Sequence, residues 1–389
     1  MFSYYFERGS LDQILTFRSG DNPGNIQIGC DVKPFGIHYF GDLTSVLCHS
    51  MQSSPYLDTT PTNYFPFSYI VLRPLIPVFE LGIGVTSILF FTLPIFAIVS
   101  SIWKKYKTSY SSSTLILLIT MILFSQPFLN LIDRGNIQLI VLAALFLALA
   151  NSSSGPNFIA PFCLGVAIAL KGYPIIYIVR FAQQKRWSEL YVSLKTALLL
   201  TVISLLIFDG GLLFNINEMV RDINAYRDTK FTSLAYNNSL MALLQSLIEL
   251  RIDFWKIGEF ATNNYVLLIL PMIIMILIIL GTKNITDFDN AILCAVFCSL
   301  FIELSPSYVL TGFLLPLIFL DDLKSITPSI SLTLFGIAGL MMPKNIPLTY
   351  VGDFANSASL NSLINPILMI MIFSTALWRL RKQSQWRAT

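Results

Sequence analysis

Long apolar runs with almost no ionisable residue are the feature that most limits what this chain can fold into. Several reach about 18 residues, enough for a helix rising 1.5 Å per residue to cross the roughly 30 Å hydrocarbon core of a bilayer. They are apolar on all sides, whereas a surface helix of a soluble protein keeps a charged face. The runs are 84–102, 113–129, 137–150, 196–208, 264–281, 291–302, 328–342 and 363–378. The sequence therefore predicts an all-α, polytopic transmembrane bundle of about nine to eleven membrane segments, some of them short or re-entrant half-helices.

The composition agrees with a protein that lives in the lipid bilayer. Only 12% of the 389 residues are charged and the mean hydropathy is +0.68, whereas a soluble domain carries about 25% charged residues. The net charge is +3 and both signs are scattered along the chain. Nothing in this balance argues for a nucleic-acid partner.

Basic residues in the short connections predict the orientation, because cytoplasmic loops carry an excess of Lys and Arg. With simple alternation these residues fall on one side: Lys104, Lys105, Lys107, Arg180, Lys185, Arg186, Lys283, Lys324, Arg379, Arg381, Lys382 and Arg387. We therefore expect a multi-pass protein of the cell membrane with residues 1–80 as an extracytoplasmic segment. Residues 81–389 would form the transmembrane domain, with a long outer loop at 210–262.

The N-terminal segment is unusual for that position, because residues 1–60 contain neither a spanning run nor a signal peptide. Either the segment folds back over the membrane face, or a first transmembrane helix lies upstream of residue 1 in the complete chain. We favour the second expectation.

One apolar region, 158–181, is interrupted by Lys171-Gly172-Tyr173-Pro174. Gly and Pro break helices, and an uncompensated lysine in the middle of a bilayer is costly. We expect two half-helices that meet near Lys171 at the outer face. The alternative is one long helix whose lysine side chain extends to the interface.

Metal and disulfide chemistry find little support in the sequence. The only histidines are His38 and His49, and no Cys/His spacing fits zinc. Cys30 and Cys48 lie in the polar N-terminal stretch, where they either pair or remain free, and the other cysteines lie in apolar runs. There is no phosphate-binding loop or dinucleotide fingerprint. We therefore predict no metal and no cofactor.

A few polar groups near the expected outer face stand out in so apolar a chain. Asp42 precedes an amphipathic stretch and is either a helix N-cap or a functional carboxylate. Arg134, beside Asp133 and a turn glycine, either belongs to a structural ion pair or binds a phosphate bidentately. Lys171 offers a point charge for phosphate. The turn 303–308 is explained adequately as a connection between two spans.

Amide and phenol groups accompany these charges. Asn237 and Asn238 end a charged stretch and re-enter an apolar segment, where side-chain amides suit sugar hydroxyls. Asn237 also fits a glycosylation sequon, which is a weak signal. Asn136 opens the apolar run 137–150, and Tyr64 precedes the apolar run 67–79.

Taken together and in this order, these groups resemble glycosyltransferase family 87, the polyprenol-phosphate-dependent mannosyltransferases of the GT-C superfamily. The likeness is strongest over 133–187, where Gly135-Asn136 opens an apolar helix and Ala169-Leu170-Lys171-Gly172-Tyr173-Pro174 precedes Lys185-Arg186-Trp187. Weaker likeness comes from Gly41-Asp42, Pro55-Tyr56, Asn63-Tyr64, Asn238-Ser239-Leu240 and Ser305-Pro306. The resemblance spans most of 40–320.

This resemblance implies a GT-C-like bundle that transfers a hexose from a polyprenyl-phosphate sugar to a glycan or glycolipid acceptor on the extracytoplasmic face, without a metal. The matching position makes Asp42 the catalytic base, and cations near the leaving phosphate would be Arg134 and Lys171. The candidate sugar- or acceptor-binding residues are Tyr64, Asn136, Tyr173, Asn237 and Asn238.

The chain departs from the family pattern in lacking a first helix before the acidic loop. Many members also carry a histidine shortly after the Ser-Pro, where Tyr308 and Thr311 stand in this chain. Two other functions fit the same architecture. One is a lipid-linked saccharide transporter or flippase, which should show internal repeats and polar residues at mid-bilayer. The other is a polysaccharide polymerase or ligase, whose donor is an oligosaccharide on a diphosphate.

Overall fold

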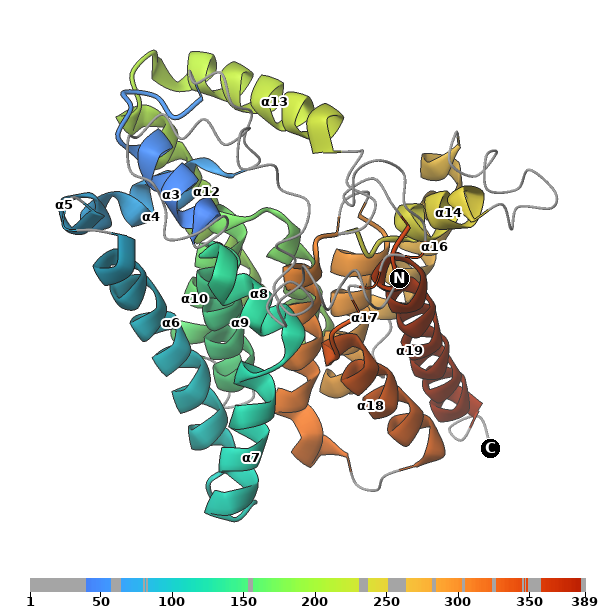
Figure 1. Ribbon diagram of the computed structural model, residues 1–389. Helices are drawn as coiled ribbons and strands as arrows, with labels where there is room; N and C mark the ends of the chain where they lie inside the picture. Colours follow the sequence, from blue (N-terminus) through green and yellow to red (C-terminus); the bar gives the residue numbers. More distant parts are fainter. Residues whose placement is uncertain are drawn as a thin grey trace, which may run out of the picture.

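The computed structural model describes residues 40–56, 64–79, 81, 83–152, 157–230, 237–250, 264–281, 285–302, 305–323, 327–344, 346, 348 and 358–385. These residues form helices and connecting turns, as the all-α expectation requires (Figure 1). In chain order the helices are α3 (Gly41–Ser50), α4 (Pro66–Leu72), η1 (Arg73–Leu75), α5 (Ile76–Phe79), α6 (Ile83–Tyr106), α7 (Ser112–Leu123), α8 (Gln126–Arg134), α9 (Gln138–Ser152), α10 (Ile159–Leu170), η2 (Tyr173–Ile178), α11 (Val179–Gln183), α12 (Trp187–Ile207), α13 (Gly211–Lys230), α14 (Leu240–Glu249), α16 (Tyr265–Leu280), α17 (Asp287–Leu300), η4 (Ser307–Asp322), α18 (Pro328–Met341) and α19 (Leu360–Gln385).

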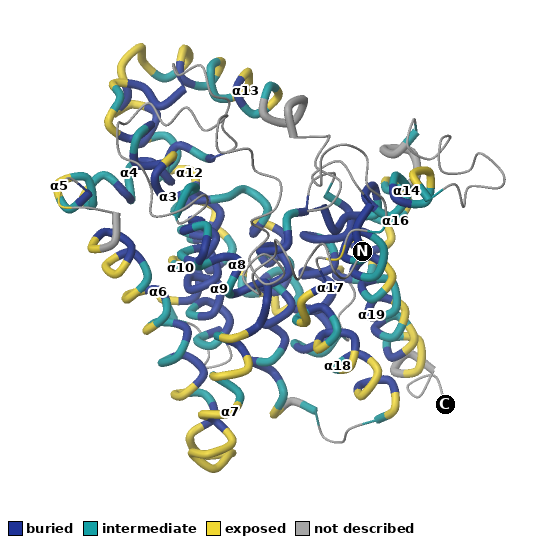
Figure 2. Tube along the Cα trace, viewed as in Figure 1, coloured by how far each residue is buried: buried dark blue, intermediate teal, exposed yellow. Residues whose placement is uncertain are grey.

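Two packed groups of helices make up the bundle. In one, α9 and α10 pack together, with α6 against α9 and α12 against α10. In the other, α17 packs against η4 and α19, and α18 packs against α19. The 3₁₀ helix η4 also contacts α8 and α9, so it joins the two groups. Helices α9 and α17 are buried along most of their length, while α6, α7 and α12 expose large apolar side chains (Figure 2).

Some of the described helices are long enough to cross a membrane, and others are shorter. Among the described residues, three helices are long and apolar enough to cross a membrane: Val85–Tyr106, Trp187–Ile207 and Leu360–Lys382. A bent pair, α7 with α8, passes the same test as a single span. Other apolar helices are 10–17 residues long. The expected nine to eleven segments remain a prediction.

The apolar run 113–129 is not one straight span, because α7 and α8 meet at an angle of 56°. Ser125 has an extended backbone (φ −65°, ψ 143°), and Pro127 stands in the first turn of α8. Proline lacks the N–H and clashes with the carbonyl of the preceding turn, so it begins a helix more readily than it continues one. The bend sets the direction in which α8 carries Arg134.

The helix break near Lys171 is present. Helix α10 ends at Leu170, Lys171 has extended backbone angles (φ −149°, ψ 116°), and η2 starts at Tyr173. The alternative of one long helix is therefore wrong, because Gly172 and Pro174 follow the lysine immediately. Helix α10 packs closely on α12 through Gly165, where a Cβ would lie 2.6 Å from the Cβ of Thr196.

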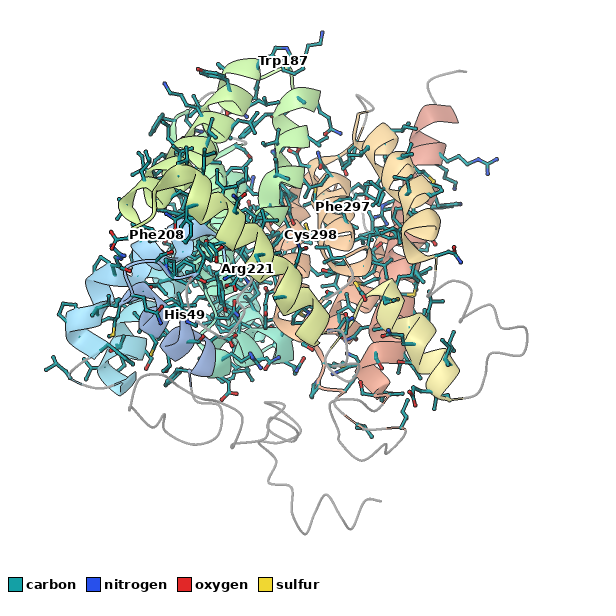
Figure 3. The ribbon with its side chains drawn as sticks, turned by 90° about the horizontal axis from the view of Figure 1, so that it is seen from above. His49, Trp187, Phe208, Arg221, Phe297 and Cys298 are labelled. Atoms are coloured by element: carbon teal, nitrogen blue, oxygen red, sulfur yellow. The ribbon has the colours of Figure 1, made fainter. Side chains whose placement is uncertain are left out.

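The segment 210–262 is less irregular than expected of a long outer loop, because it contains α13 and α14. Helix α13 starts at Gly211 (φ 80°) directly after Gly210 (φ 97°), and the two glycines allow a sharp turn after α12. It lies across the end of the bundle where α3 is found, with Arg221 on its length (Figures 1 and 3). One half of the suggested Cys30–Cys48 pair, Cys30, lies outside the described residues.

Candidate active site

Asp42 stands in the first turn of α3, where a carboxylate is favoured by the helix dipole. The N-cap interpretation is wrong, because Phe40 occupies the N-cap position and no side chain caps the helix there. Instead, Arg134 binds the carboxylate with two donors: its Nε lies 3.0 Å from Oδ2 and its Nη2 lies 2.9 Å from Oδ1. Such a bidentate pair fixes both the direction and the distance of the two groups.

The helix ends that carry this pair are held together by backbone contacts. The N–H of Phe40 donates to the carbonyl of Asp133 over 2.8 Å, and Phe40 has a left-handed backbone (φ 61°, ψ 30°). Gly135 ends α8 at φ 61°, and a Cβ at this position would lie 2.8 Å from the Cβ of Leu43. Left-handed angles are costly for residues other than glycine and often occur at functional sites. The start of α3 is therefore in direct contact with the end of α8.

Asn136 is the residue that connects the separate parts of the site, and it is fully buried. Its Nδ2 donates to Asp42 Oδ2 at 2.6 Å and to the Tyr64 hydroxyl at 3.1 Å. Its Oδ1 accepts from the Lys171 ammonium at 3.2 Å and from the backbone N–H of Gln138 at 2.9 Å. One amide thus orients the carboxylate, the phenol, the lysine and the first turn of α9.

The ammonium of Lys171 lies at the broken end of α10. Ser68 of α4 donates to the carbonyl of Leu170 at 2.8 Å, which satisfies a helix-terminal acceptor beside the lysine. The ammonium then lies 5.4 Å from the ring centre of Tyr64 and 5.2 Å from that of Tyr308. Aromatic faces attract cations at this distance, so the two rings hold the lysine between them.

The electrostatics of the site follow from having two cations beside one carboxylate. Burial raises the pKa of Asp42, but the charge and hydrogen bonds of Arg134, the hydrogen bond from Asn136 and the charge of Lys171 outweigh it. The pKa therefore lies below its usual 3.8, and the group is a carboxylate at neutral pH. Burial lowers the pKa of Lys171 to about 8, although the charge of Asp42 opposes this.

The site is neither sealed nor fully exposed. The Arg134 side chain is 36% exposed and that of Asp42 is 17% exposed, so a ligand can reach the ion pair from outside the bundle. No group of three or more His, Cys, Asp or Glu side chains suited to a metal ion occurs among the described residues. The arrangement offers a base, two cations and oriented amide and phenol groups.

Tyr173 reaches this cluster only through another residue. Its hydroxyl accepts a short hydrogen bond from the side chain of Gln138, whose backbone in turn donates to Asn136. We did not predict a role for Gln138 or Tyr308 from the sequence. The signal for Gln138 was a single amide at the start of the apolar run 137–150.

Asn237 and Asn238 are bonded to a different segment. Asn237 Oδ1 accepts from the N–H of Ser305 at 2.8 Å, and the Asn238 side chain donates to the Ser305 carbonyl at 2.9 Å. Asn365 of α19 donates to Asn238 Oδ1 at 2.7 Å. These contacts hold the turn before Tyr308, and the sugar-binding role expected for the two asparagines stays a prediction.

Comparison with known proteins identifies the family of the chain. The model of glycosyltransferase family 87 matches residues 62–306 of the 389-residue chain. That range includes Tyr64, Arg134, Asn136 and Lys171, whereas Asp42 precedes it. Neither the curated proteins nor the solved structures contain a match. Because the family model covers more than half of a chain with apolar helices of spanning length, the protein belongs to glycosyltransferase family 87 and is a membrane glycosyltransferase.

Proposed function

We propose that the enzyme transfers a hexose, with mannose as the leading candidate, from a polyprenyl-phosphate sugar to a glycan or glycolipid acceptor on the extracytoplasmic face of the cell membrane. One observation carries the proposal: a carboxylate, Asp42, and two cations, Arg134 and Lys171, share one hydrogen-bonded cluster with Asn136 at its centre. A phosphate leaving group and an attacking hydroxyl require these opposite kinds of group within one site.

The chemistry is a direct displacement at the anomeric carbon. An acceptor hydroxyl oxygen forms the new bond to this carbon while the bond from the carbon to the phosphate oxygen breaks. The hydroxyl proton passes to Asp42, and the polyprenyl phosphate leaves with the electron pair of the broken bond. Arg134 and Lys171 then stabilise the negative charge that develops on the phosphate.

The ion pair has a consequence for the order of events. Asp42 bound bidentately by Arg134 is a weakened base, since its pKa lies below the usual value. A donor phosphate competes for the same guanidinium, which prefers planar bidentate anions. As Arg134 turns towards the phosphate, Asp42 loses its strongest partner and becomes more basic. Donor binding therefore prepares the carboxylate for the acceptor.

The proposal is tested with the full chain reconstituted in liposomes and three labelled donors. These are polyprenyl-phosphate mannose, GDP-mannose and an oligosaccharide on polyprenyl diphosphate. We expect label to pass to glycolipid only from the first donor. Transfer from GDP-mannose alone would overturn the donor class, and transfer from the diphosphate would indicate a polymerase or ligase. Label that merely crosses the bilayer unchanged would indicate a transporter.

A matched pair of arginine variants tests the phosphate contact. Arg134→Gln should raise the KM for the lipid donor at least about tenfold, because a charge-assisted bidentate contact is lost. Arg221→Gln serves as the control, since Arg221 lies on α13 at the same end of the bundle and its side chain is 64% exposed. Equal donor KM values for the two variants would refute the role of Arg134.

A further inference from the structure

Helix α8 carries polar side chains into the interior of the bundle. Gln126 and Asn130 are only 3% and 4% exposed, and Asp133 on the same side is also buried. At about 100° per residue these positions fall within an arc of about 60°. Leu129 and Ile132, on another side of the helix, are less deeply buried. Phe128 and Leu131 of α8 are also buried, at 2% and 0% exposed, so the three polar side chains are enclosed within the bundle together with apolar ones.

The hydrogen-bonding capacity of these amides is not used up by the protein. Gln126 Nε2 and Asn130 Oδ1 are buried and form no hydrogen bond within the described part of the chain. Gln138, the first residue of α9, adds a third such atom, Oε1, while its Nε2 binds Tyr173. Most buried polar atoms in folded proteins are paired, and leaving one unpaired is destabilising. The three unpaired atoms on α8 and in the first turn of α9 are therefore candidates for hydrogen bonds with a ligand.

The position of the amides connects them to the active site. Asn130 precedes Arg134 by one helical turn, which is about 6 Å along the axis, and Gln126 precedes it by about 12 Å. Gln138 directly follows the turn that contains Asn136, with its N–H bonded to the Asn136 side chain. Asn130 and Gln126 therefore lie one and two helical turns from Arg134 along α8, and Gln138 lies beside Asn136.

We propose that Gln126, Asn130 and Gln138 form a subsite that hydrogen-bonds the hydroxyl groups of a hexose ring held beside the ion pair. This inference rests on the proposed function, because it assigns the sugar of that reaction to residues that the reaction scheme leaves open. The unpaired atoms comprise one donor and two acceptors. A hydroxyl both donates and accepts, whereas an ionised phosphate only accepts, so sugar hydroxyls satisfy all three atoms.

The experiment uses two apolar replacements of similar size, Asn130→Leu and Gln126→Met, in the full chain. If the amides bind a ligand, each ligand-free variant should be more stable than the ligand-free wild type, because the substitution removes an unpaired buried polar atom. We expect the thermal midpoint to rise by about 2–4 °C. The same variants should transfer sugar less well, with a KM raised about two- to tenfold for each hydrogen bond lost. Ile132→Leu on another side of α8 is the control and should change neither value.

A second measurement separates the donor sugar from the acceptor sugar. Thermal stabilisation by polyprenyl-phosphate mannose is compared with that by bare polyprenyl phosphate. In the wild type the sugar-bearing lipid should stabilise more. If Asn130→Leu abolishes this difference, the subsite binds the donor hexose. If the difference persists while transfer falls, the subsite binds the acceptor hexose.

The outcomes also separate this inference from the proposed function. A lower thermal midpoint for both variants, or unchanged transfer, would overturn the subsite and assign the amides to structure or to bound water. A wild type that neither transfers mannose from the lipid donor nor is stabilised by it would overturn the proposed function itself.

Discussion

Two clusters of paired charge lie near opposite ends of α17, and they differ in what their charges are paired with. Beyond the C-terminal end of the helix, Tyr308 of η4 lies against Lys171, next to the Asp42–Arg134 pair. At the N-terminal end, Asp287 pairs with Arg180 and Asp289 pairs with Arg379. Fourteen residues of α-helix separate the ends by about 21 Å.

The N-terminal cluster is balanced, and its Asp289–Arg379 pair is closed, whereas the Asp287 side chain is 28% exposed. Arg379 Nε lies 2.8 Å from Asp289, and the Arg379 Nη1 donates to the Ser329 carbonyl at 3.0 Å and to the Thr333 hydroxyl at 2.7 Å. Asp289 is 2% exposed and also accepts from Thr286 at 3.0 Å. Each arginine thus has its own carboxylate, and the contacts join α17, α18 and α19.

The active-site cluster is partly open and, within the described part of the chain, has two cations around the Asp42 carboxylate. Burial and ion pairing are common to both clusters, so these two properties alone do not identify a site. What distinguishes a site is access for a ligand and, among the described residues, an excess of one charge. The N-terminal cluster fits a structural role, since removing one member would leave a buried charge without its partner.

The largest expected effect separates the two clusters by activity. Asp42→Asn should reduce sugar transfer about 10²–10⁴-fold, the usual contribution of a general base. Asp289→Asn should reduce transfer only as far as it reduces the amount of folded enzyme. Initial rates per folded molecule, with folded protein measured by gel filtration, test this. Comparable rates for the two variants would remove the basis for calling Asp42 the base.

Stability should respond in the reverse order. Asp289→Ala leaves the buried Arg379 charge without its carboxylate, so we expect a loss of about 3–5 kcal/mol in the free energy of unfolding. Asp42→Ala leaves Arg134 able to reach water, so its loss should be nearer about 1 kcal/mol or less. Unfolding by SDS in mixed micelles measures both. A larger loss for Asp42→Ala would mean that the open cluster is the structural one.

The pH dependence of donor binding tests the charge of Lys171. Its pKa of about 8 means that the ammonium loses its proton as pH rises through 8. The KM for the lipid donor should therefore rise above that pH, and Lys171→Arg should remove the rise because arginine stays charged. Between about 8 and the ordinary 10.5 the unfolded chain binds more protons, so folding stability should increase over the same range. A flat donor KM in the wild type would contradict the assignment.

The smallest effect concerns the rings around the ammonium. Tyr308→Leu removes one aromatic face and should raise the donor KM about two- to fivefold, in line with a cation–π contact of about 0.5–1 kcal/mol. Tyr308→Phe keeps the face and is the matched control. If both variants raise the KM equally, the hydroxyl of Tyr308 matters and its ring does not.

Several parts of the site could be predicted from the sequence because their signals are local. Gly172 and Pro174 beside Lys171 predicted the end of α10, and Gly135-Asn136 predicted a turn before an apolar helix. By contrast, the pairing of Asp42 with Arg134 joins residues 92 positions apart. Asn237 and Asn238 had the right residue type for sugar contacts, but their described partners belong to the 305–307 turn and α19. Which amides are satisfied by protein and which are left for a ligand depends on packing.

By itself the sequence determined that the chain is a helical membrane protein with helix breaks near its polar groups. Runs of apolar residues and the backbone limits of Gly and Pro act over one or two helical turns, so they can be read along the chain. Only the tertiary structure decided that Asn136 would connect Asp42, Tyr64 and Lys171, because this requires the ends of α3, α8 and α10 to meet. The left-handed backbone of Phe40 before α3 and of Gly135 after α8 accompanies that contact, which is a property of two helices packed together and not of either one alone.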